Sequence, residues 1–162
     1  MKFVFVPEIT IGDILTIIMI MVILVTYYFS RRSEKKLQKA IFIRDYTKQL
    51  HEKSGISSIF FDIDYNRFTF NKEILGTEKE VHLVSLLDML NSLAFNYVNG
   101  IINIGDIDET TLGYAISRVY LNPEVQKYLK HVDEHSANIK MNVTAFGHFR
   151  ELGDKLSKKL YG

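Results

Sequence analysis

Two groups of acidic and imidazole side chains have the residue types and spacing that could bind a divalent metal ion. His131 and His135 lie one helical turn apart, but a valine follows His131 where an H-E-x-x-H metalloprotease motif has its glutamate. Glu78, Glu80 and His82 occupy alternate positions, and alternate residues of a helix diverge around its axis. We interpret this second group as an acid-rich helix start, which the helix dipole favours. Since no third ligand accompanies the His pair, we predict no metal site.

A third group, Asp106, Asp108 and Glu109, begins like a calcium-binding loop but lacks the Gly and the distant Glu of an EF-hand. We expect a turn there, with Asp108 capping the helix that follows. The chain has no phosphate-cradling glycine loop, no G-x-S-x-G motif and no cysteine. The lack of cysteine excludes disulfides, thiolate zinc sites and cysteine nucleophiles. We predict no cofactor and no nucleotide hydrolysis or acyl transfer.

One further pair could take part in chemistry. Arg44 and His51 lie seven residues apart in a segment without Gly or Pro, so a helix would place both on one face. We interpret them as exposed residues of that helix, in a protein that is not an enzyme. The pair also resembles the Arg/His motif of HEPN ribonucleases, in which residues from two subunits cleave RNA by acid–base chemistry without metal. That resemblance implies an alternative, a ribonuclease with Arg44 and His51 as catalytic residues.

These candidates follow a stretch that is long and apolar enough to cross a membrane. Residues 14–29 are sixteen residues without a charge, and residues 9–12 with Ser30 extend them to roughly the 20 that a transmembrane helix needs. A cleaved signal peptide would have basic residues before the stretch and small residues after it, but only Lys2 precedes it. A soluble core helix would show a polar side, whereas only Thr16 and Thr26 are polar here. We predict one transmembrane helix.

The residues directly after the apolar stretch predict its orientation. Residues 31–53 carry eight Lys or Arg against three Asp or Glu, whereas residues 54–162 carry eleven against fourteen. Basic residues beside a span stay on the cytoplasmic side, so we expect an outside N-terminus and a cytoplasmic C-terminal domain at a bacterial inner membrane. Contact with the lipid bilayer is predicted for the interface residues Tyr27, Tyr28, Arg31, Arg32, Lys35 and Lys36.

The least apolar face of the predicted span is the candidate surface for a pore lining or for helix contact. A single helix cannot enclose a channel, so a pore requires a homo-oligomer. Asp13 fits a carboxylate at a helix start, and the alternative is a ring of carboxylates at a channel mouth. The candidate residues are Gly12, Asp13, Thr16, Met19, Ile23, Thr26 and Ser30.

The chain divides into three predicted segments. Residues 1–30 form the N-terminal arm and transmembrane helix, residues 31–53 a basic helical stalk, and residues 54–162 a cytoplasmic helical domain. The stalk has an apolar stripe that includes Ile43, Tyr46 and Leu50. Its partner is either the core of the domain or the same helix of a second subunit.

The fold class is mostly α, a small helical bundle with one insertion. Alternating residues at 61–65 and 68–70 fit a short β-hairpin turned by Asn66 and, equally, a packed irregular loop. Gly100 is a helix stop, and Asn122 followed by Pro is a helix start. The periodicity of apolar residues predicts helices over 78–99, 109–121, 124–135 and 142–160.

Over residues 14–132 the chain resembles a family of small bacterial single-span membrane proteins found near prophages and defence genes. The resemblance lies in the span, the charged stalk and two helices of the types LLDMLNSLAFNYVNG and ETTLGYAISRVY. In size and layout the chain also resembles the membrane accessory protein of type VI-B CRISPR systems, which carries a HEPN-like Arg/His pair. That resemblance implies an oligomeric membrane pore that strengthens RNA-guided antiphage defence, with a CRISPR effector or RNA as a partner.

Together these features predict a non-enzymatic, oligomeric membrane effector of antiphage defence that forms a pore or perturbs the inner membrane. Two alternatives remain: a membrane-tethered, metal-independent HEPN-like ribonuclease, and a passive anchor whose helical domain docks another protein.

Overall fold

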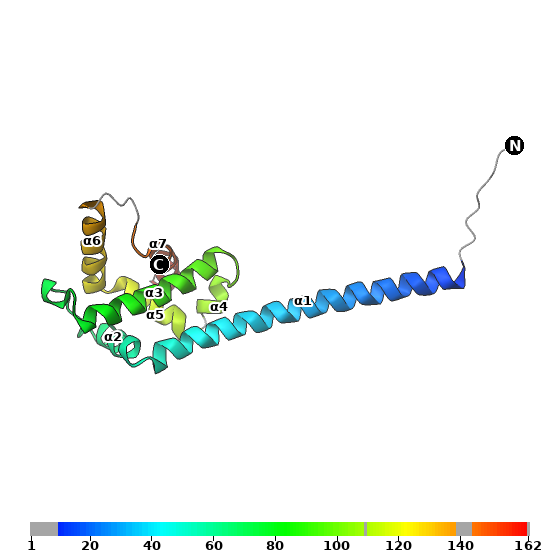
Figure 1. The fold of residues 1–162 in the computed structure, drawn as a ribbon, viewed down its shortest axis with the longest axis horizontal. Coiled ribbons are helices and arrows are strands. Elements are labelled where there is room, and N and C mark those ends of the chain that lie inside the picture. Colours follow the sequence, from blue (N-terminus) through cyan, green and yellow to red (C-terminus); the bar gives the residue numbers. More distant parts are fainter. Residues whose placement is uncertain (1–9, 109, 139–143, 162) are drawn as a thin grey trace. The chain divides into compact units, whose positions relative to one another are not determined.

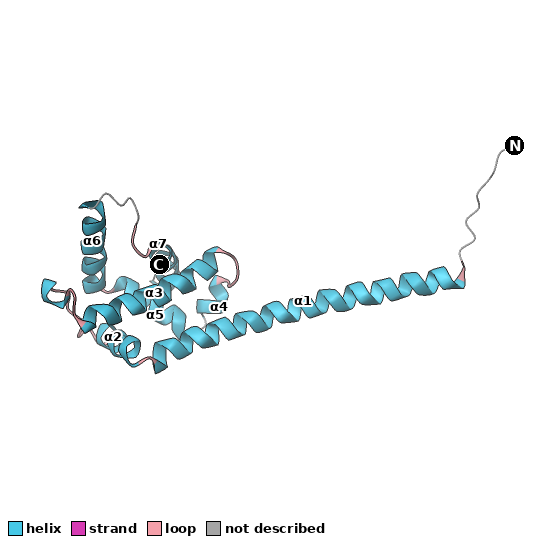
Figure 2. Ribbon diagram, in the orientation of Figure 1, coloured by secondary structure: helices cyan, strands magenta, loops and turns pink. Residues whose placement is uncertain are grey.

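The structure, a computed structural model, describes residues 10–108, 110–138 and 144–161, and side chains up to residue 159. Within these ranges the chain forms seven α-helices and one short 3₁₀ helix, and it contains no strand (Figures 1 and 2). The elements are α1 (Ile11–Glu52), α2 (Ser54–Asp64), η1 (Lys72–Ile74), α3 (Glu78–Val98), α4 (Ile104–Asp108), α5 (Thr111–Leu121), α6 (Pro123–Asn138) and α7 (Gly147–Tyr161).

The chain divides into two units, with Gln38 the last residue of the first and Lys39 the first of the second. The described part of the first unit is Thr10 and the N-terminal portion of α1, and every residue of it is exposed. No Gly or Pro interrupts the 42-residue helix after Gly12, so nothing in its sequence breaks the backbone hydrogen-bond pattern. The prediction that the apolar helix continues through the basic residues after it is confirmed, because α1 runs without interruption to Glu52.

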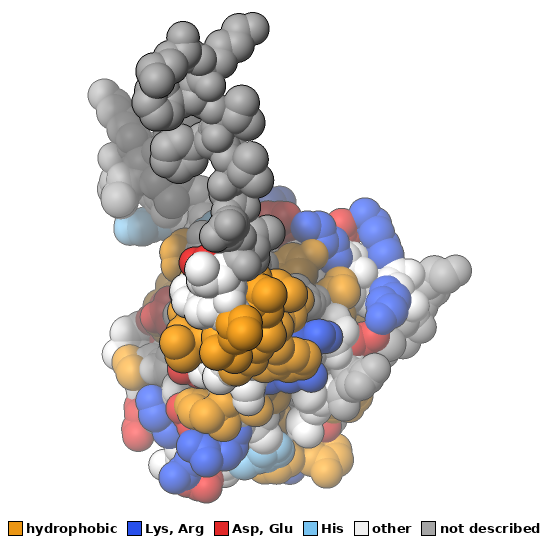
Figure 3. All heavy atoms as spheres, turned by 90° about the vertical axis from the view of Figure 1, so that its right-hand side faces the viewer, with side chains coloured by type: hydrophobic (Ala, Val, Ile, Leu, Met, Phe, Trp, Pro, Cys, Tyr) orange, Lys and Arg blue, Asp and Glu red, His pale blue; other side chains and the backbone are white. Residues whose placement is uncertain are grey.

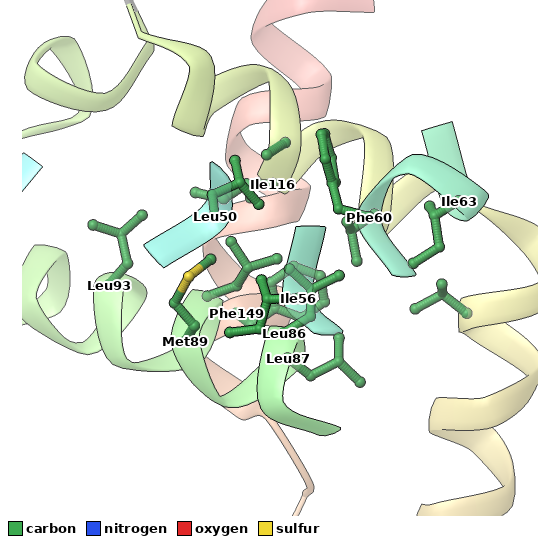
Figure 4. Close-up of a cluster of buried hydrophobic side chains, with 14 of the residues drawn as sticks. Leu50, Ile56, Phe60, Ile63, Leu86, Leu87, Met89, Leu93, Ile116 and Phe149 are labelled. Carbon is green, nitrogen blue, oxygen red and sulfur yellow. The ribbon is translucent and has the colours of Figure 1, made fainter. Parts of the chain in front are cut away.

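The second unit has one hydrophobic core. Helix α7 packs against both α3 and α5, and α2 packs against α3. Figure 4 shows side chains from α1, α2, α3, α5 and α7 meeting in this core. The labelled residues are Leu50, Ile56, Phe60, Ile63, Leu86, Leu87, Met89, Leu93, Ile116 and Phe149.

The last turns of α1 belong to this core. Leu50 is buried, and Ile43 and Tyr46 are half-buried against the same cluster. The Tyr46 hydroxyl accepts a hydrogen bond from Asn96 Nδ2 at 3.0 Å, and burial raises the pKa of Tyr46. In this chain the predicted stripe of the stalk therefore packs on the core of its own domain.

Of the two alternatives for the insertion, the β-hairpin is wrong, because residues 54–64 form helix α2 and the described residues contain no strand. Ile56, Ile59, Phe60 and Ile63 recur at helical spacing, and all four are buried. The alternation at 61–65 is a local coincidence within this helical pattern. After α2 the chain turns at Asn66, whose φ is +54°, and continues without regular structure to η1.

The predicted ends of the later helices hold in most cases. Helix α3 matches its prediction, and Gly100 follows it with a φ of +69°. Asn122 caps α6, because its Oδ1 accepts the N–H groups of Glu124 at 3.0 Å and Val125 at 3.2 Å. Pro123 is the first residue of that helix, as predicted.

Two predicted helix starts need correction. Asp108 does not cap α5, because it ends α4; the cap is Thr110, whose Oγ1 accepts the N–H of Leu112 at 3.2 Å. The last helix begins at Gly147, and the predicted start at residue 142 lies outside the described residues. The Oδ1 of Asn91 in α3 accepts the N–H of Phe149 in the first turn of α7.

Candidate membrane-spanning segment

The N-terminal part of α1 is a helix with an apolar surface on every side. No Asp, Glu, Lys or Arg lies between Asp13 and Arg31, and large apolar side chains from Ile14 to Phe29 are 49% to 63% exposed. Figure 3 looks toward the N-terminal end of α1, where hydrophobic side chains gather. Among the described residues, α1 alone is long and apolar enough to cross a membrane, by length and composition. An apolar surface of this extent is typical of a membrane or protein contact.

Both threonines of this segment have their hydroxyl hydrogens bonded within the helix. Thr16 Oγ1 donates to the carbonyl of Gly12 at 2.8 Å, and Thr26 Oγ1 donates to the carbonyl of Val22 at 2.8 Å. A buried hydroxyl without a partner is costly in lipid, and these bonds remove that cost for the donors. The segment therefore places no unpaired threonine donor in an apolar environment.

The predicted contact face is continuous along the helix. At about 100° per residue, its members other than Asp13 fall within an arc of about 80°. All of them are exposed, so the structure leaves this face open to lipid, to water or to another helix. These residues are Gly12, Thr16, Met19, Ile23, Thr26 and Ser30.

Asp13 lies about 100° from the middle of that face and forms a capping box with Thr10. Its Oδ2 accepts the backbone N–H of Thr10 at 2.9 Å and the Thr10 hydroxyl at 2.7 Å. In return the Thr10 hydroxyl oxygen accepts the N–H of Asp13 at 3.2 Å. These bonds explain the carboxylate at position 13 by its role in starting the helix. A ring of carboxylates at a channel mouth is not needed to explain it.

An aromatic and basic collar follows the apolar segment. Tyr27, Tyr28 and Phe29 are about 60% exposed, and the rings of Tyr28 and Phe29 meet edge to face with centroids 6.0 Å apart. Amphipathic rings of this kind favour the level of lipid headgroups. Two shallow hollows open on the helix beside them, one lined by Tyr28, Arg31, Arg32 and Lys35, and one by Phe29, Arg32, Ser33 and Lys36.

The Arg44 and His51 pair lies beyond this collar, on the part of α1 that joins the second unit. Both residues are exposed, and the Arg44 side chain, 75% exposed, has Asp45 Oδ1 at 3.5 Å. Two helical turns separate the pair, which is about 10 Å along the axis. Within one chain the two side chains are therefore not brought together, and the face that they share is open.

Side chains of the three groups that were considered as metal ligands make other contacts in the structure. The described residues contain no group of three or more His, Cys, Asp or Glu that could hold a metal ion. Glu80 Oε2 accepts the N–H of Gly76 at 2.6 Å just before α3. His131 packs against the ring of Phe70, with centroids 5.7 Å apart. Asp106 Oδ2 accepts the N–H of Asn103 at 2.7 Å, which closes the first turn of α4.

A polar cluster that the sequence does not predict joins the end of α2 to α5. Arg118 Nε donates to Asp64 Oδ1 at 3.1 Å, and Arg118 Nη2 donates to the Asp64 carbonyl at 2.6 Å. The hydroxyl of Tyr114 donates to the same carboxylate. The partners lie 50 and 54 residues apart, so no local spacing could reveal them. The positive charge of Arg118 balances the negative charge of the Asp64 carboxylate. This pairing is typical of a structural link between helices.

The chain matches no family model, no curated protein and no solved structure.

Proposed function

We propose that the protein is a single-span membrane effector whose copies associate through α1 and make the membrane permeable. The observation that supports this proposal best is the N-terminal part of α1, whose side chains from Ile14 to Ser30 are exposed all round and uncharged. In water that surface would be costly, at about 25 cal/mol for each Å² of apolar area, and lipid removes this cost. The basic collar after the segment supports a cytoplasmic second unit.

The face from Gly12 to Ser30 supports association between copies. Small and hydroxyl-bearing residues let two helix backbones approach closely in lipid, where apolar burial gives no preference for contact. The hydroxyl groups of Thr16 and Thr26 remain acceptors toward water or toward a neighbouring helix. An effector of this kind acts through assembly in the membrane and needs no catalytic residue. Its place in antiphage defence, with a CRISPR effector or RNA as partner, is proposed from the family resemblance.

The test combines the size of the assembly with its effect on the membrane. Light scattering, corrected for bound detergent, gives the mass of the full-length protein, and we expect at least about five copies for an enclosed pore. Expression in cells is expected to cause dye entry and depolarisation. The variant Thr16→Leu/Thr26→Leu is expected to stay in the membrane and to lose both effects.

The matched control changes the opposite face of the same helix. Ile17→Leu/Val25→Leu alters two exposed apolar residues and leaves the face with Thr16 and Thr26 intact. Permeability is expected to remain in this control. A monomeric or dimeric protein, or equal permeability in the two variants, would contradict a pore built on this face.

A ribonuclease is the second candidate, because Arg44 and His51 are exposed on one face where a second copy could reach them. The purified protein would then cleave single-stranded RNA in the presence of a chelator, and His51→Ala would abolish cleavage. His135→Ala is the control, since His135 is also an exposed histidine near the end of a helix. Activity that survives His51→Ala would exclude this candidate.

A further inference from the structure

The basic residues after the apolar segment gather on one side of α1. Successive residues of an α-helix are turned by about 100° around its axis. On this basis an arc of about 100° around α1 contains, in order, Arg31, Lys35, Tyr28 and Arg32. Lys36 lies about 40° beyond Arg32. The four residues within the arc line one shallow hollow on the helix surface, and Tyr28 is 63% exposed.

The other side of the same turns carries no basic residue. Leu37 lies about 180° from Tyr28, Ser33 about 140° and Glu34 about 120°. All three are exposed, so the one-sided charge does not result from packing within the chain. Retention of basic residues on the cytoplasmic side depends on how many lie near the span, and a ring around the helix would serve equally well. Orientation in the membrane therefore does not explain why the cations share one face with a tyrosine.

We propose that Tyr28, Arg31, Arg32 and Lys35 form a binding site for the phosphate of an anionic phospholipid headgroup. Two guanidinium groups can hold phosphate oxygens through paired N–H donors, and a lysine adds a mobile positive charge. The Tyr28 ring lies where a lipid headgroup meets its acyl chains, and its hydroxyl can donate to the same phosphate. This site rests on the proposed function in one respect, since α1 must cross the membrane to place it at headgroup level.

The charge surroundings favour an anionic lipid over a zwitterionic one. Glu34 is the single acidic residue between positions 31 and 44, and it lies outside the arc of the site. A headgroup with a net negative charge gains from all three cations, whereas a choline headgroup would bring its own cation to the cluster. The site therefore takes the phosphodiester of an anionic glycerophospholipid.

The experiment uses the full-length protein in a neutral detergent and measures bound lipids by native mass spectrometry. Phosphatidylglycerol, phosphatidylcholine and inorganic phosphate are the three probes. We expect retention of phosphatidylglycerol with a defined stoichiometry, and little retention of phosphatidylcholine. Equal retention of the two lipids would overturn the site, and displacement of phosphatidylglycerol by an equal concentration of inorganic phosphate would overturn its assignment to a lipid.

A variant that moves two of the cations around the helix tests whether the lipid binds to a specific site or is attracted by the overall positive charge of the segment. Arg32→Ser/Ser33→Arg with Lys35→Leu/Leu37→Lys keeps the composition and the net charge and shifts each cation by no more than two residues along the helix, but moves both cations around the helix away from Tyr28. We expect the affinity for phosphatidylglycerol to fall about tenfold or more. All four positions are exposed, so the change leaves the core intact. Unchanged affinity would show that diffuse charge alone attracts the lipid.

Extraction of membranes with alkaline carbonate tests separately whether α1 spans the membrane. Its result therefore distinguishes a failure of the lipid site from a failure of the proposed function. Wild-type protein that stays in the membrane and shows no preference for phosphatidylglycerol would contradict the lipid site and leave the membrane effector standing. Protein that carbonate releases from the membrane would contradict the span itself, and with it the proposed function.

Discussion

Lys39 and Asp106 join the second-unit part of α1 to α4, with Lys39 Nζ 2.9 Å from Asp106 Oδ2. The same carboxylate oxygen accepts the N–H of Asn103. The backbone hydrogen bond from Asn103, followed by the bond from Lys39, holds the pKa of Asp106 below its ordinary value of 3.8. One acidic side chain thus closes the start of a short helix and pairs with the first residue of the second-unit part of α1.

The pH dependence of stability follows from this lowered pKa. A carboxylate whose pKa is lower in the folded state stabilises the fold above its unfolded pKa, and the contribution is lost as pH falls through the folded pKa. Asp106→Ala is expected to lower the free energy of unfolding by about 1 kcal/mol near neutral pH. As the pH falls from about 5 through the lowered pKa of Asp106, the variant is expected to lose less stability than wild type.

Urea unfolding of the detergent-solubilised protein at several pH values measures this difference. Lys39→Met is the partner variant, because it removes the ion pair and keeps the hydrogen bond from Asn103. A smaller effect is expected there, since partly exposed ion pairs contribute about 0 to 1 kcal/mol. Equal pH profiles for wild type and Asp106→Ala would refute the assignment.

Asn91 is expected to stabilise α7 from a distance of 58 residues, because its Oδ1 accepts the N–H of Phe149 at 3.1 Å. Asn91→Ala leaves this N–H without its acceptor, next to the buried Phe149 ring. The free energy of unfolding should fall by about 1 to 2 kcal/mol, the usual cost of losing a helix cap. Asn91→Asp retains an acceptor oxygen and should lose much less. Thermal unfolding followed by circular dichroism distinguishes the two variants, and equal losses would count against the cap.

Two glycines of the second unit should respond in opposite ways to alanine. A Cβ on Gly113 would lie 2.8 Å from the carbonyl oxygen of Ile107 and 2.9 Å from the Cα of Asp108, both backbone atoms of α4. Gly113→Ala is therefore expected to destabilise the fold by about 1 to 3 kcal/mol. At Gly105, within α4 itself, a Cβ meets nothing within 4 Å, so Gly105→Ala should be neutral or stabilising by up to about 1 kcal/mol. Chemical denaturation of both variants gives the comparison.

The membrane orientation can be tested with single cysteines, because the chain has none of its own. Lys2 precedes the proposed span in the sequence, and Lys130, whose side chain is 79% exposed, lies after it in the second unit. In intact spheroplasts a membrane-impermeant maleimide is expected to label Lys2→Cys and not Lys130→Cys. After lysis both should react. The reverse pattern would show an inverted span, and labelling of both sites before lysis would argue against a span.

Local signals in the sequence were enough to predict several elements. Helix α3 has a long apolar periodicity with Gly100 after it, and α6 begins with an Asn-Pro pair whose cap geometry needs no distant partner. The apolar segment of α1 was equally accessible, because its length and lack of charge depend on composition alone.

Features that depend on contacts between residues far apart in the chain could not be predicted from the sequence. Helix α2 was missed because its aromatic and β-branched residues also alternate over a few positions, and only burial of Ile56, Ile59 and Ile63 on one face decides between the two patterns. The cap of α5 was misplaced by two residues, since Asp108 and Thr110 are both good capping residues. The link between Asp64 and Arg118 bridges 54 residues, and no spacing rule predicts it.

The burial of Leu50 has a consequence for proteolytic release of the domain. The core of the second unit includes Leu50, with Ile43 and Tyr46 packed beside it, so a fragment beginning at residue 54 would lack side chains that fill its interior. A protease that cuts between Ser33 and Gln38 would instead leave this interior complete. Cleavage in that short exposed stretch would separate the apolar segment from the second unit and release the second unit as a domain with its core intact.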